Sequence, residues 1–425
     1  MGKYAQPFIF EAIMTKLYHT TIVYLITFCF MVMTNASFAQ STVEGLWYLT
    51  KKPVSVEMKD GKIFKITPIK KLSDEAHPPF IAPGLIDNQV NGFAGVSFCL
   101  AGGELTREGI LKATQELWKK GVTTYLPTLT SNSREVLVRN FTLLAKTKND
   151  PELNGSIVGY HLEGPYISPI DGFRGAHPLR HMRKPDWKEF MEFYEASGRN
   201  ITTITVAPEL EGAIDFIKKC TEIGITVAIG HHNGSKEIIE EAVANGAKTT
   251  THLGNGCSNM INRHVNPLWP QLANDKLMAS LICDGFHLRD EEIIVFYKAK
   301  GPNRTIITSD VTHYATLPPG EYKNDEGETI QLTKEGMVRL ASQNVLYGSA
   351  SPLSRGVAHM IKVTGCSLGE AIQMASTNPA KLYGWKDRGV LAPGKRADLI
   401  LFEVGENDLT IKKTFVAGKL VYEAQ

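Results

Sequence analysis

Ile225-Thr-Val-Ala-Ile-Gly-His231 is a short run of β-branched and small apolar residues that ends in a histidine. Three other short runs of this kind end in a histidine or an acidic residue: Ile157-Val-Gly-Tyr-His-Leu-Glu163, Lys248-Thr-Thr-Thr-His252 and Arg304-Thr-Ile-Ile-Thr-Ser-Asp310. Each run has the length and composition of a buried strand. If all four are parallel strands of one barrel, their terminal side chains face one opening. The pattern therefore predicts a barrel with a polar site at the carboxyl ends of its strands.

Strand and helix patterns alternate through the middle of the chain. Helical periodicity covers residues 107–120, 134–146, 213–222 and 235–244. Strand candidates begin near Ile81, Thr123, Ile157, Ile201, Ile225, Lys248, Met278 and Arg304. Eight strands with intervening helices over roughly 250 residues predict an α/β fold, a (β/α)8 TIM-like barrel. A doubly wound open sheet is the structural alternative.

Both ends of the chain show strand-like pieces separated by turn residues, such as those around Asp60-Gly61 and Gly418-Lys419. We expect these two ends to build one small β-sandwich beside the barrel. The predicted division is a signal peptide at 1–39, the β-sandwich at 40–82 and 388–425, and the (β/α)8 barrel at 83–387.

The N-terminus has the pattern of a secretory signal peptide. Lys16 precedes the apolar run Ile22–Met33, and small residues in 35–39 suit a cleavage site before Gln40. The run is shorter than the roughly 20 residues of a permanent membrane span. We therefore expect export, as to a periplasm, with no stable span after processing. An uncleaved anchor, a translation start at Met14 and a cytoplasmic location are the alternatives.

Composition excludes several classes of function. The chain has 425 residues, 43% of them hydrophobic, and a net charge of +2, so it carries no electrostatic signature for nucleic acid. The six cysteines show neither paired spacing nor a CxxC motif. This spacing argues against a disulfide framework or a zinc ribbon and favours buried thiols.

Two imidazoles and a carboxylate form a common hydrolytic metal set with one position open for water. We assign Glu163, His231 and His252 as ligands of one divalent metal ion, with zinc preferred and iron or another divalent metal as alternatives. His232 follows His231, and only one of two adjacent side chains points inward from a strand end. Asp310, the fourth residue of the set, is predicted to move the proton of the attacking water.

The first barrel strand limits the number of metals. Near the end of this strand stand Gln89 and Asn91, whose neutral amides are poor ligands for a transition metal. The run 201–209 offers no lysine that could bridge two ions. One metal ion is therefore predicted, with Gln89 and Asn91 near it.

Several motifs carry a family resemblance that extends from about residue 45 to the end. They are Pro83-Gly-Leu-Ile-Asp87, His161-Leu-Glu-Gly-Pro165, Asp284-Gly-Phe-His287, Thr308-Ser-Asp310 and the run 389–399. These motifs resemble the amidohydrolase superfamily. Within it, the chain resembles the N-acetylglucosamine-6-phosphate deacetylases, most specifically in the His-Leu-Glu-Gly-Pro element and the Gln-x-Asn of the first strand.

The resemblance implies further site residues. His177 matches the histidine that polarises the acetyl carbonyl, and Asn255, Gly256 and His287 match positions that bind the amino sugar and its phosphate. Arg263 matches an arginine that reaches across a dimer interface, which implies a homodimer. The loop 252–257 departs from the usual pattern, in which an aromatic stands at position 254 and Ala-Met at 256–257.

The site residues predict a metal-dependent hydrolase, and the resemblance implies a deacetylase of N-acetylglucosamine 6-phosphate or a related N-acetyl amino sugar. Sugar phosphates are kept in the cytoplasm, which conflicts with an exported chain. One alternative is therefore an exported amidohydrolase that acts on unphosphorylated N-acetyl sugars or N-acyl amino acids. An alternative of another class is an inactive carbohydrate-binding barrel.

Overall fold

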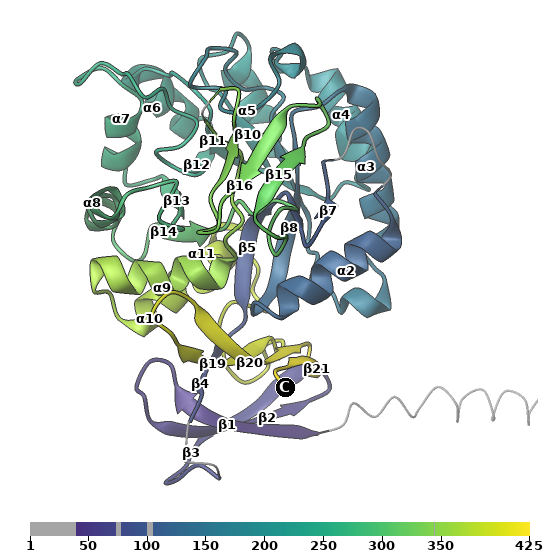
Figure 1. The fold of residues 1–425 in the computed structure, drawn as a ribbon, viewed down its shortest axis with the longest axis vertical. Coiled ribbons are helices and arrows are strands. Elements are labelled where there is room, and N and C mark those ends of the chain that lie inside the picture. The colour runs from purple at the N-terminus through teal and green to yellow at the C-terminus, as the bar shows by residue number, and fades with distance from the viewer. Residues whose placement is uncertain (1–39, 74–77, 100–104, 344) are drawn as a thin grey trace, which may run out of the picture.

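The computed structural model describes residues 40–73, 78–99, 105–343 and 345–425, so the predicted signal peptide lies outside the described residues. Eight parallel strands form the central sheet (Figure 1). In spatial order they are β5 (Leu85–Val90), β8 (Val122–Thr130), β9 (Tyr160–Glu163), β10 (Ile201–Val206), β11 (Thr226–Ile229), β12 (Ala247–Thr250), β13 (Met278–Ile282) and β14 (Thr305–Thr308). The Asn91 N–H donates to the Val311 carbonyl at 2.8 Å and joins the two edge strands. The predicted (β/α)8 barrel is confirmed.

Helices surround the barrel, and polar side chains fix where several of them begin. Thr106, Ser133 and Ser235 each accept a hydrogen bond from a backbone N–H in the first turn of the following helix, which satisfies an otherwise unpaired donor. The helices are α2 (Arg107–Trp118), α3 (Arg134–Thr147), α4 (Trp187–Ala196), α5 (Ala213–Glu222), α6 (Lys236–Ala244), α7 (Leu268–Ala273), α8 (Asp290–Lys300), α9 (Leu353–Thr364), α10 (Leu368–Met374) and α11 (Thr377–Leu382).

The two chain ends form one mixed seven-stranded sheet below the barrel in Figure 1. Its order is β21 (Lys419–Glu423), β20 (Leu409–Val416), β19 (Leu399–Val404), β4 (Phe80–Pro83), β1 (Ser41–Trp47), β2 (Pro53–Lys59) and β3 (Lys62–Pro68). The antiparallel pair β4–β19 joins the N-terminal half to the C-terminal half. The two chain ends, predicted to build one small β-sandwich, thus lie together in a single seven-stranded sheet. The strand expected near Ile81 belongs to this sheet, and the first barrel strand begins at Leu85.

Two smaller sheets were not predicted from the sequence. One consists of β15 (Gly320–Lys323), β16 (Thr329–Leu332), β17 (Val338–Leu340) and β18 (Val345–Leu346). Tyr314, Ile330 and Leu340 belong to its own small core. The other is the two-stranded sheet of β6 (Gly92–Phe93) and β7 (Val96–Ser97). Figure 1 shows β15 and β16 in front of the barrel.

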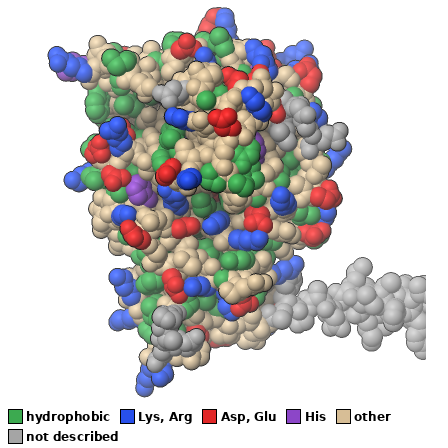
Figure 2. Space-filling model, in the orientation of Figure 1, with side chains coloured by type: hydrophobic (Ala, Val, Ile, Leu, Met, Phe, Trp, Pro, Cys, Tyr) green, Lys and Arg blue, Asp and Glu red, His purple; other side chains and the backbone are tan. Residues whose placement is uncertain are grey.

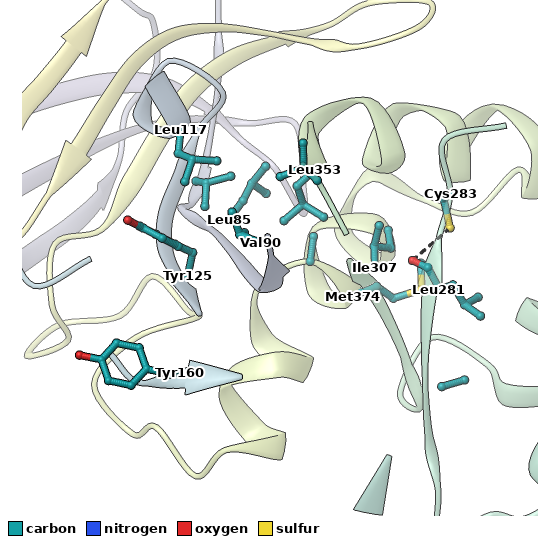
Figure 3. Close-up of a cluster of buried hydrophobic side chains, with 14 of the residues drawn as sticks. Leu85, Val90, Leu117, Tyr125, Tyr160, Leu281, Cys283, Ile307, Leu353 and Met374 are labelled. Atoms are coloured by element: carbon teal, nitrogen blue, oxygen red, sulfur yellow. Dashed lines mark hydrogen bonds between the residues drawn. The ribbon is translucent and has the colours of Figure 1, made fainter. Parts of the chain in front are cut away.

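The main core lies between the barrel strands and the helices. Figure 3 shows Leu85, Val90, Ile307 and Leu353 packed together where β5, β14 and α9 meet. All four side chains are at most 1% exposed. This packing makes the barrel wall rigid, which fixes the positions of the residues at the strand ends.

The surface and the cysteines fit the composition. Figure 2 shows acidic and basic side chains interspersed over one face, with no large area of a single sign. The five cysteines among the described residues are all free thiols, three buried and two half-buried. Within the described part of the chain, no helix is both long and apolar enough to cross a membrane.

Candidate metal centre and active site

The four residues at the strand ends meet as predicted at one end of the barrel. Glu163 is the last residue of β9, whereas His231, His252 and Asp310 each come two residues after a strand. All four are buried. The three that follow strands have positive φ angles of 51°, 27° and 50°, a region that side chains other than glycine rarely adopt. Strain of this kind concentrates at functional sites, where the fold holds a side chain in a required direction.

Three of these side chains converge on one point. His252 Nε2 lies 2.9 Å from Glu163 Oε1 and 3.0 Å from His231 Nε2, and the third side of the triangle, from His231 Nε2 to Glu163 Oε1, is 3.4 Å. Ligands about 2.0–2.1 Å from a tetrahedral zinc ion are roughly 3.3 Å apart. The triangle therefore has the dimensions of a single metal site.

Hydrogen bonding also suits a metal. His231 Nδ1 lies 2.9 Å from the Phe173 carbonyl oxygen, so it carries the proton and Nε2 presents a lone pair to the centre. Without a cation, two imidazole nitrogens and a carboxylate oxygen would crowd together in a buried space. The residues present fit one divalent ion, and no other metal-like cluster of histidine, cysteine and carboxylate side chains occurs among the described residues.

Asp310 stands beside this triangle but is held by amides. Gln89 Nε2 donates to Asp310 Oδ1 at 2.9 Å, and Asn91 Nδ2 donates to the same oxygen at 2.6 Å. Burial and the nearby charge of Glu163 raise the pKa of Asp310 to about 7, while the Asn91 hydrogen bond acts in the opposite direction. The side-chain amides of Gln89 and Asn91 thus orient the Asp310 carboxylate, whose second oxygen remains available to take up a proton.

A buried carboxylate, that of Asp87, connects β5 to the end of β14 through hydrogen bonds. Asp87 accepts hydrogen bonds from the Ser309 hydroxyl, the Ser309 backbone N–H and the Thr308 hydroxyl. Burial raises the pKa of Asp87 to about 6, although these hydrogen bonds act to lower it. The network fixes the residue preceding Asp310, a role that the sequence did not reveal even though Asp87 ends the Pro-Gly-Leu-Ile-Asp motif.

His177 lies against the metal triangle, on the long loop after β9. Its ring centroid is 4.6 Å from that of His231, and its Nδ1 is 3.0 Å from Ser131 Oγ. Burial, followed by the proximity of His231, lowers the pKa of His177 to about 3, so the imidazole is neutral. If the Ser131 hydroxyl donates to Nδ1, the proton of His177 sits on Nε2. Ser131 is 46 residues away in sequence and was not predicted.

A cavity of about 460 Å³ opens over the triangle. Asn255, Gly256 and His287, which were predicted to bind substrate, all line it, and so do His177 and Asp310. Arg263 is exposed and does not line the cavity of its own subunit. Its role across a dimer interface stays a prediction.

His287 is held by an acid that sequence reasoning missed. Its Nδ1 donates to Asp284 Oδ2 at 2.8 Å, and Asp284 also accepts from the backbone N–H groups of Phe286 and His287 and from the Ser349 hydroxyl. Burial alone would lower the pKa of His287, but the attraction of Asp284 outweighs it and raises the pKa. The spacing of three residues between Asp284 and His287 is the signal that could have identified this pair.

Two glycines explain the unusual loop after His252. A Cβ on Gly254 would lie 2.8 Å from Leu288 Cδ2, so Leu288 fills the space beside this residue. A Cβ on Gly256 would lie 2.7 Å from His231 Nδ1. Both glycines also have positive φ angles. In this chain the loop therefore passes directly against the ring of His231, one of the three candidate metal ligands.

Three further histidines have separate environments. His161 Nε2 is 2.7 Å from the Thr205 hydroxyl of β10, which occupies that ring nitrogen. His232 is buried and accepts from the Gly234 N–H at 3.1 Å, so a surface position is excluded. His313 lines the cavity as well.

Barrel, buried triangle and oriented carboxylate together define a hydrolase of the metal-dependent barrel class. Residues 80–421 match the Amidohydrolase family. The N-acetylglucosamine-6-phosphate deacetylase from Bos taurus is 31% identical to this chain, and the match covers 81% of this chain and 84% of the bovine protein. The N-acetylglucosamine-6-phosphate deacetylase from Caenorhabditis elegans is 32% identical, and the match covers 81% of this chain and 83% of that protein. The crystal structure of the N-acetylglucosamine-6-phosphate deacetylase from Thermotoga maritima superposes with a TM-score of 0.77 at 28% identity, covering 90% of this chain and 100% of that one. The chain belongs to the amidohydrolase family and, within it, to the N-acetylglucosamine-6-phosphate deacetylases; it is a hydrolase of amide C–N bonds.

Proposed function

We propose that this enzyme removes the acetyl group from N-acetylglucosamine 6-phosphate and releases glucosamine 6-phosphate and acetate. The observation that carries the proposal is the convergence of Glu163, His231 and His252 in a cavity that Asp310 and His177 also line. The relatives and the structural neighbour that bear this activity in their names support the choice of substrate.

The proposed cofactor is one zinc ion held by Glu163, His231 and His252. Two nitrogen ligands and one carboxylate oxygen suit zinc. The amides of Gln89 and Asn91 donate to Asp310 and are therefore not available to bind a second ion. When bound, the ion supplies Lewis acidity, which makes water more acidic and polarises the amide carbonyl.

The protein side chains then manage the protons. Asp310 accepts a proton from the attacking water through the oxygen that Gln89 and Asn91 leave free, and the remaining OH bonds to the acetyl carbon. The neutral His177 donates its Nε2 proton in a hydrogen bond to the acetyl oxygen, where negative charge develops. Asp310 finally delivers its proton to the sugar nitrogen as the C–N bond breaks, because an amine leaves readily only when protonated.

A substrate panel tests the proposal. Metal-depleted protein should be inactive on N-acetylglucosamine 6-phosphate and should regain activity with zinc. The zinc enzyme should prefer this substrate over N-acetylglucosamine and over N-acetyl amino acids. Equal rates on all three would reject the sugar phosphate as the substrate, and activity that survives complete chelation would reject the metal-dependent mechanism.

We further propose a homodimer in which Arg263 acts on the partner's substrate. Arg263 is exposed and lies outside the cavity of its own subunit, which is the arrangement expected of a residue that works in trans. Mixing an Arg263→Ala subunit with an Asp310→Asn subunit should restore part of the activity in hybrid dimers. Absence of rescue would remove the intersubunit role.

A further inference from the structure

The cavity has one lysine or arginine among the described residues that line it, and that residue is Arg289. Arg289 is the residue before α8, two positions after His287. Figure 1 shows α8 on the outside of the barrel beside β13. The loop between β13 and α8 therefore brings two basic residues to one wall of the cavity.

These two residues differ in depth. The His287 side chain is 5% exposed and the Arg289 side chain is 82% exposed, so His287 lies deep in the wall and Arg289 lies at the mouth. His287 Nδ1 is used by Asp284, which leaves Nε2 as the polar atom available to the cavity. An elongated ligand with its reacting amide at the metal triangle could contact His287 first and Arg289 farther out.

Among the described residues, the Arg289 guanidinium has only one loose ion-pair partner. Its nearest acid is Glu291, at 4.0 Å, beyond hydrogen-bond distance, and the side chain makes no hydrogen bond to any described residue. Glu292 also lines the cavity, but one of its oxygens accepts from the Arg289 backbone N–H at 2.8 Å. All five guanidinium N–H donors remain for a ligand, and their planar fork matches a phosphate or carboxylate.

We propose that Arg289 binds the anionic end of the substrate within the same subunit and thereby sets the preference for a phosphorylated amino sugar over an unphosphorylated one. The proposal rests on the proposed function and deepens it. It assigns a phosphate contact to a residue of this chain's own cavity wall, in addition to any arginine supplied by a partner.

The test compares Arg289→Gln and Arg289→Lys with the wild-type metal-loaded enzyme on N-acetylglucosamine 6-phosphate and on N-acetylglucosamine. Because Arg289 is exposed, solvent weakens its pairing, and we expect Arg289→Gln to lower kcat/KM for the phosphorylated sugar about tenfold, mainly through KM. The value for the free sugar should change less than about twofold, and Arg289→Lys should keep part of the preference. Arg199→Gln, which removes an equal charge in the loop between α4 and β10, is the matched control.

Binding of inorganic phosphate and of glucosamine 6-phosphate, measured by calorimetry, gives a readout independent of turnover. Arg289→Gln should weaken both about tenfold, and the control variant should weaken neither. Normal turnover of the phosphorylated sugar with unchanged specificity and phosphate affinity in Arg289→Gln would overturn this inference and leave the proposed function intact. Absence of turnover in the wild type, with phosphate binding that depends on Arg289, would reject the proposed function and retain the anion site.

Discussion

Asn91 Nδ2 donates to Asp310 Oδ1 across 2.6 Å, from the end of the first barrel strand to the end of the eighth. Gln89 adds a second donor to the same oxygen. Two neutral amides therefore hold the carboxylate to which we assign the proton transfer in the proposed function. Their fixed geometry directs the other oxygen of Asp310 toward the reaction, because Oδ1 is already occupied by two donors.

Asp310→Asn should strongly reduce turnover while the metal stays bound. The substitution keeps the shape of the side chain but removes the base, and general acid–base catalysis contributes about 10²–10⁴-fold. We expect kcat to fall by about 10³-fold at unchanged metal content, measured by elemental analysis. Asp275→Asn, which changes an exposed carboxylate paired with Arg304, controls for the loss of charge. Unchanged turnover in Asp310→Asn would exclude Asp310 from the proton transfer.

Asn91→Ala should shift the pH profile. Asp310 must be ionised to act as a base, so activity is lost as the pH falls through its pKa, which burial raises to about 7. The hydrogen bond from Asn91 stabilises the ionised form, and removing it raises this pKa further. The acidic limb of kcat/KM should move upward by roughly one unit. A uniform loss of activity at every pH would show instead that Asn91 only supports the structure.

Much of the fold and the metal triangle could be predicted because each ligand lies at or just after the end of a short strand of distinctive composition. Glu163 and His231 needed only the strand pattern and the geometry of a parallel barrel. The start of the first barrel strand could not be placed in the same way, because β4 and β5 are consecutive extended segments that pair in different sheets. Periodicity identifies an extended segment but not its pairing partner.

Supporting residues were missed for a related physical reason. The contact between Ser131 and His177 depends on how two distant loops fold over the barrel, and no local spacing encodes it. The sheet of β15 to β18 was missed because its strands are only two to four residues long. Segments this short give too few positions for an alternation pattern.

Asp284→Asn should destabilise the protein in a pH-dependent way. Burial alone would raise the pKa of Asp284, but the charge of His287 and the hydrogen bonds that Asp284 accepts outweigh burial and lower this pKa. The contribution of the Asp284 carboxylate to folding stability is therefore lost as the pH falls. The pKa of His287 is raised in the folded protein. The contribution of the His287 charge to folding stability is therefore fully present below about pH 6.5 and is lost as the pH rises through the pKa of the folded protein. The ion pair therefore stabilises the fold most between about pH 4 and 6.5.

Unfolding midpoints of Asp284→Asn and the wild type should accordingly differ more at pH 6 than at pH 9. Loss of one member of a buried pair costs about 3–5 kcal/mol, and an isosteric amide that keeps some hydrogen bonds should cost less, about 2–3 kcal/mol. A stability difference that is equal at the two pH values would mean that His287 is not charged in the folded protein.

Removing the metal should lower stability as well as activity. An ion that binds only the folded state adds about 2.7 kcal/mol when its free concentration is 100 times Kd. Chelation should therefore lower the thermal midpoint, and zinc should restore it. Glu163→Gln should abolish this response because it removes one of three ligands, whereas Glu195→Gln, at an exposed pair with Arg199, should keep it. A zinc response that persists in Glu163→Gln would place the ion elsewhere.

Gly256→Ala should weaken metal binding, although alanine is the residue that the family pattern has at this position. The added Cβ would lie 2.7 Å from His231 Nδ1 and 2.9 Å from Cγ, too close without movement of the ring or the loop. Any shift of that ring also strains the hydrogen bond between His231 Nδ1 and the Phe173 carbonyl, which sets the tautomer of the ligand. We expect metal affinity to fall about 10–100-fold, measured by competition with a chromogenic chelator.

Gly384→Ala is the matched control for this effect. Gly384 has a φ angle of 70° against 59° for Gly256, but a Cβ there would meet no atom within 4 Å. Both substitutions carry the backbone cost of a left-handed conformation, about 1–2 kcal/mol, so both should lower the thermal midpoint. Only Gly256→Ala should lose metal affinity, because only its Cβ contacts a ligand ring. Equal metal affinity in the two variants would mean that the loop moves aside freely and that its sequence does not control the metal site.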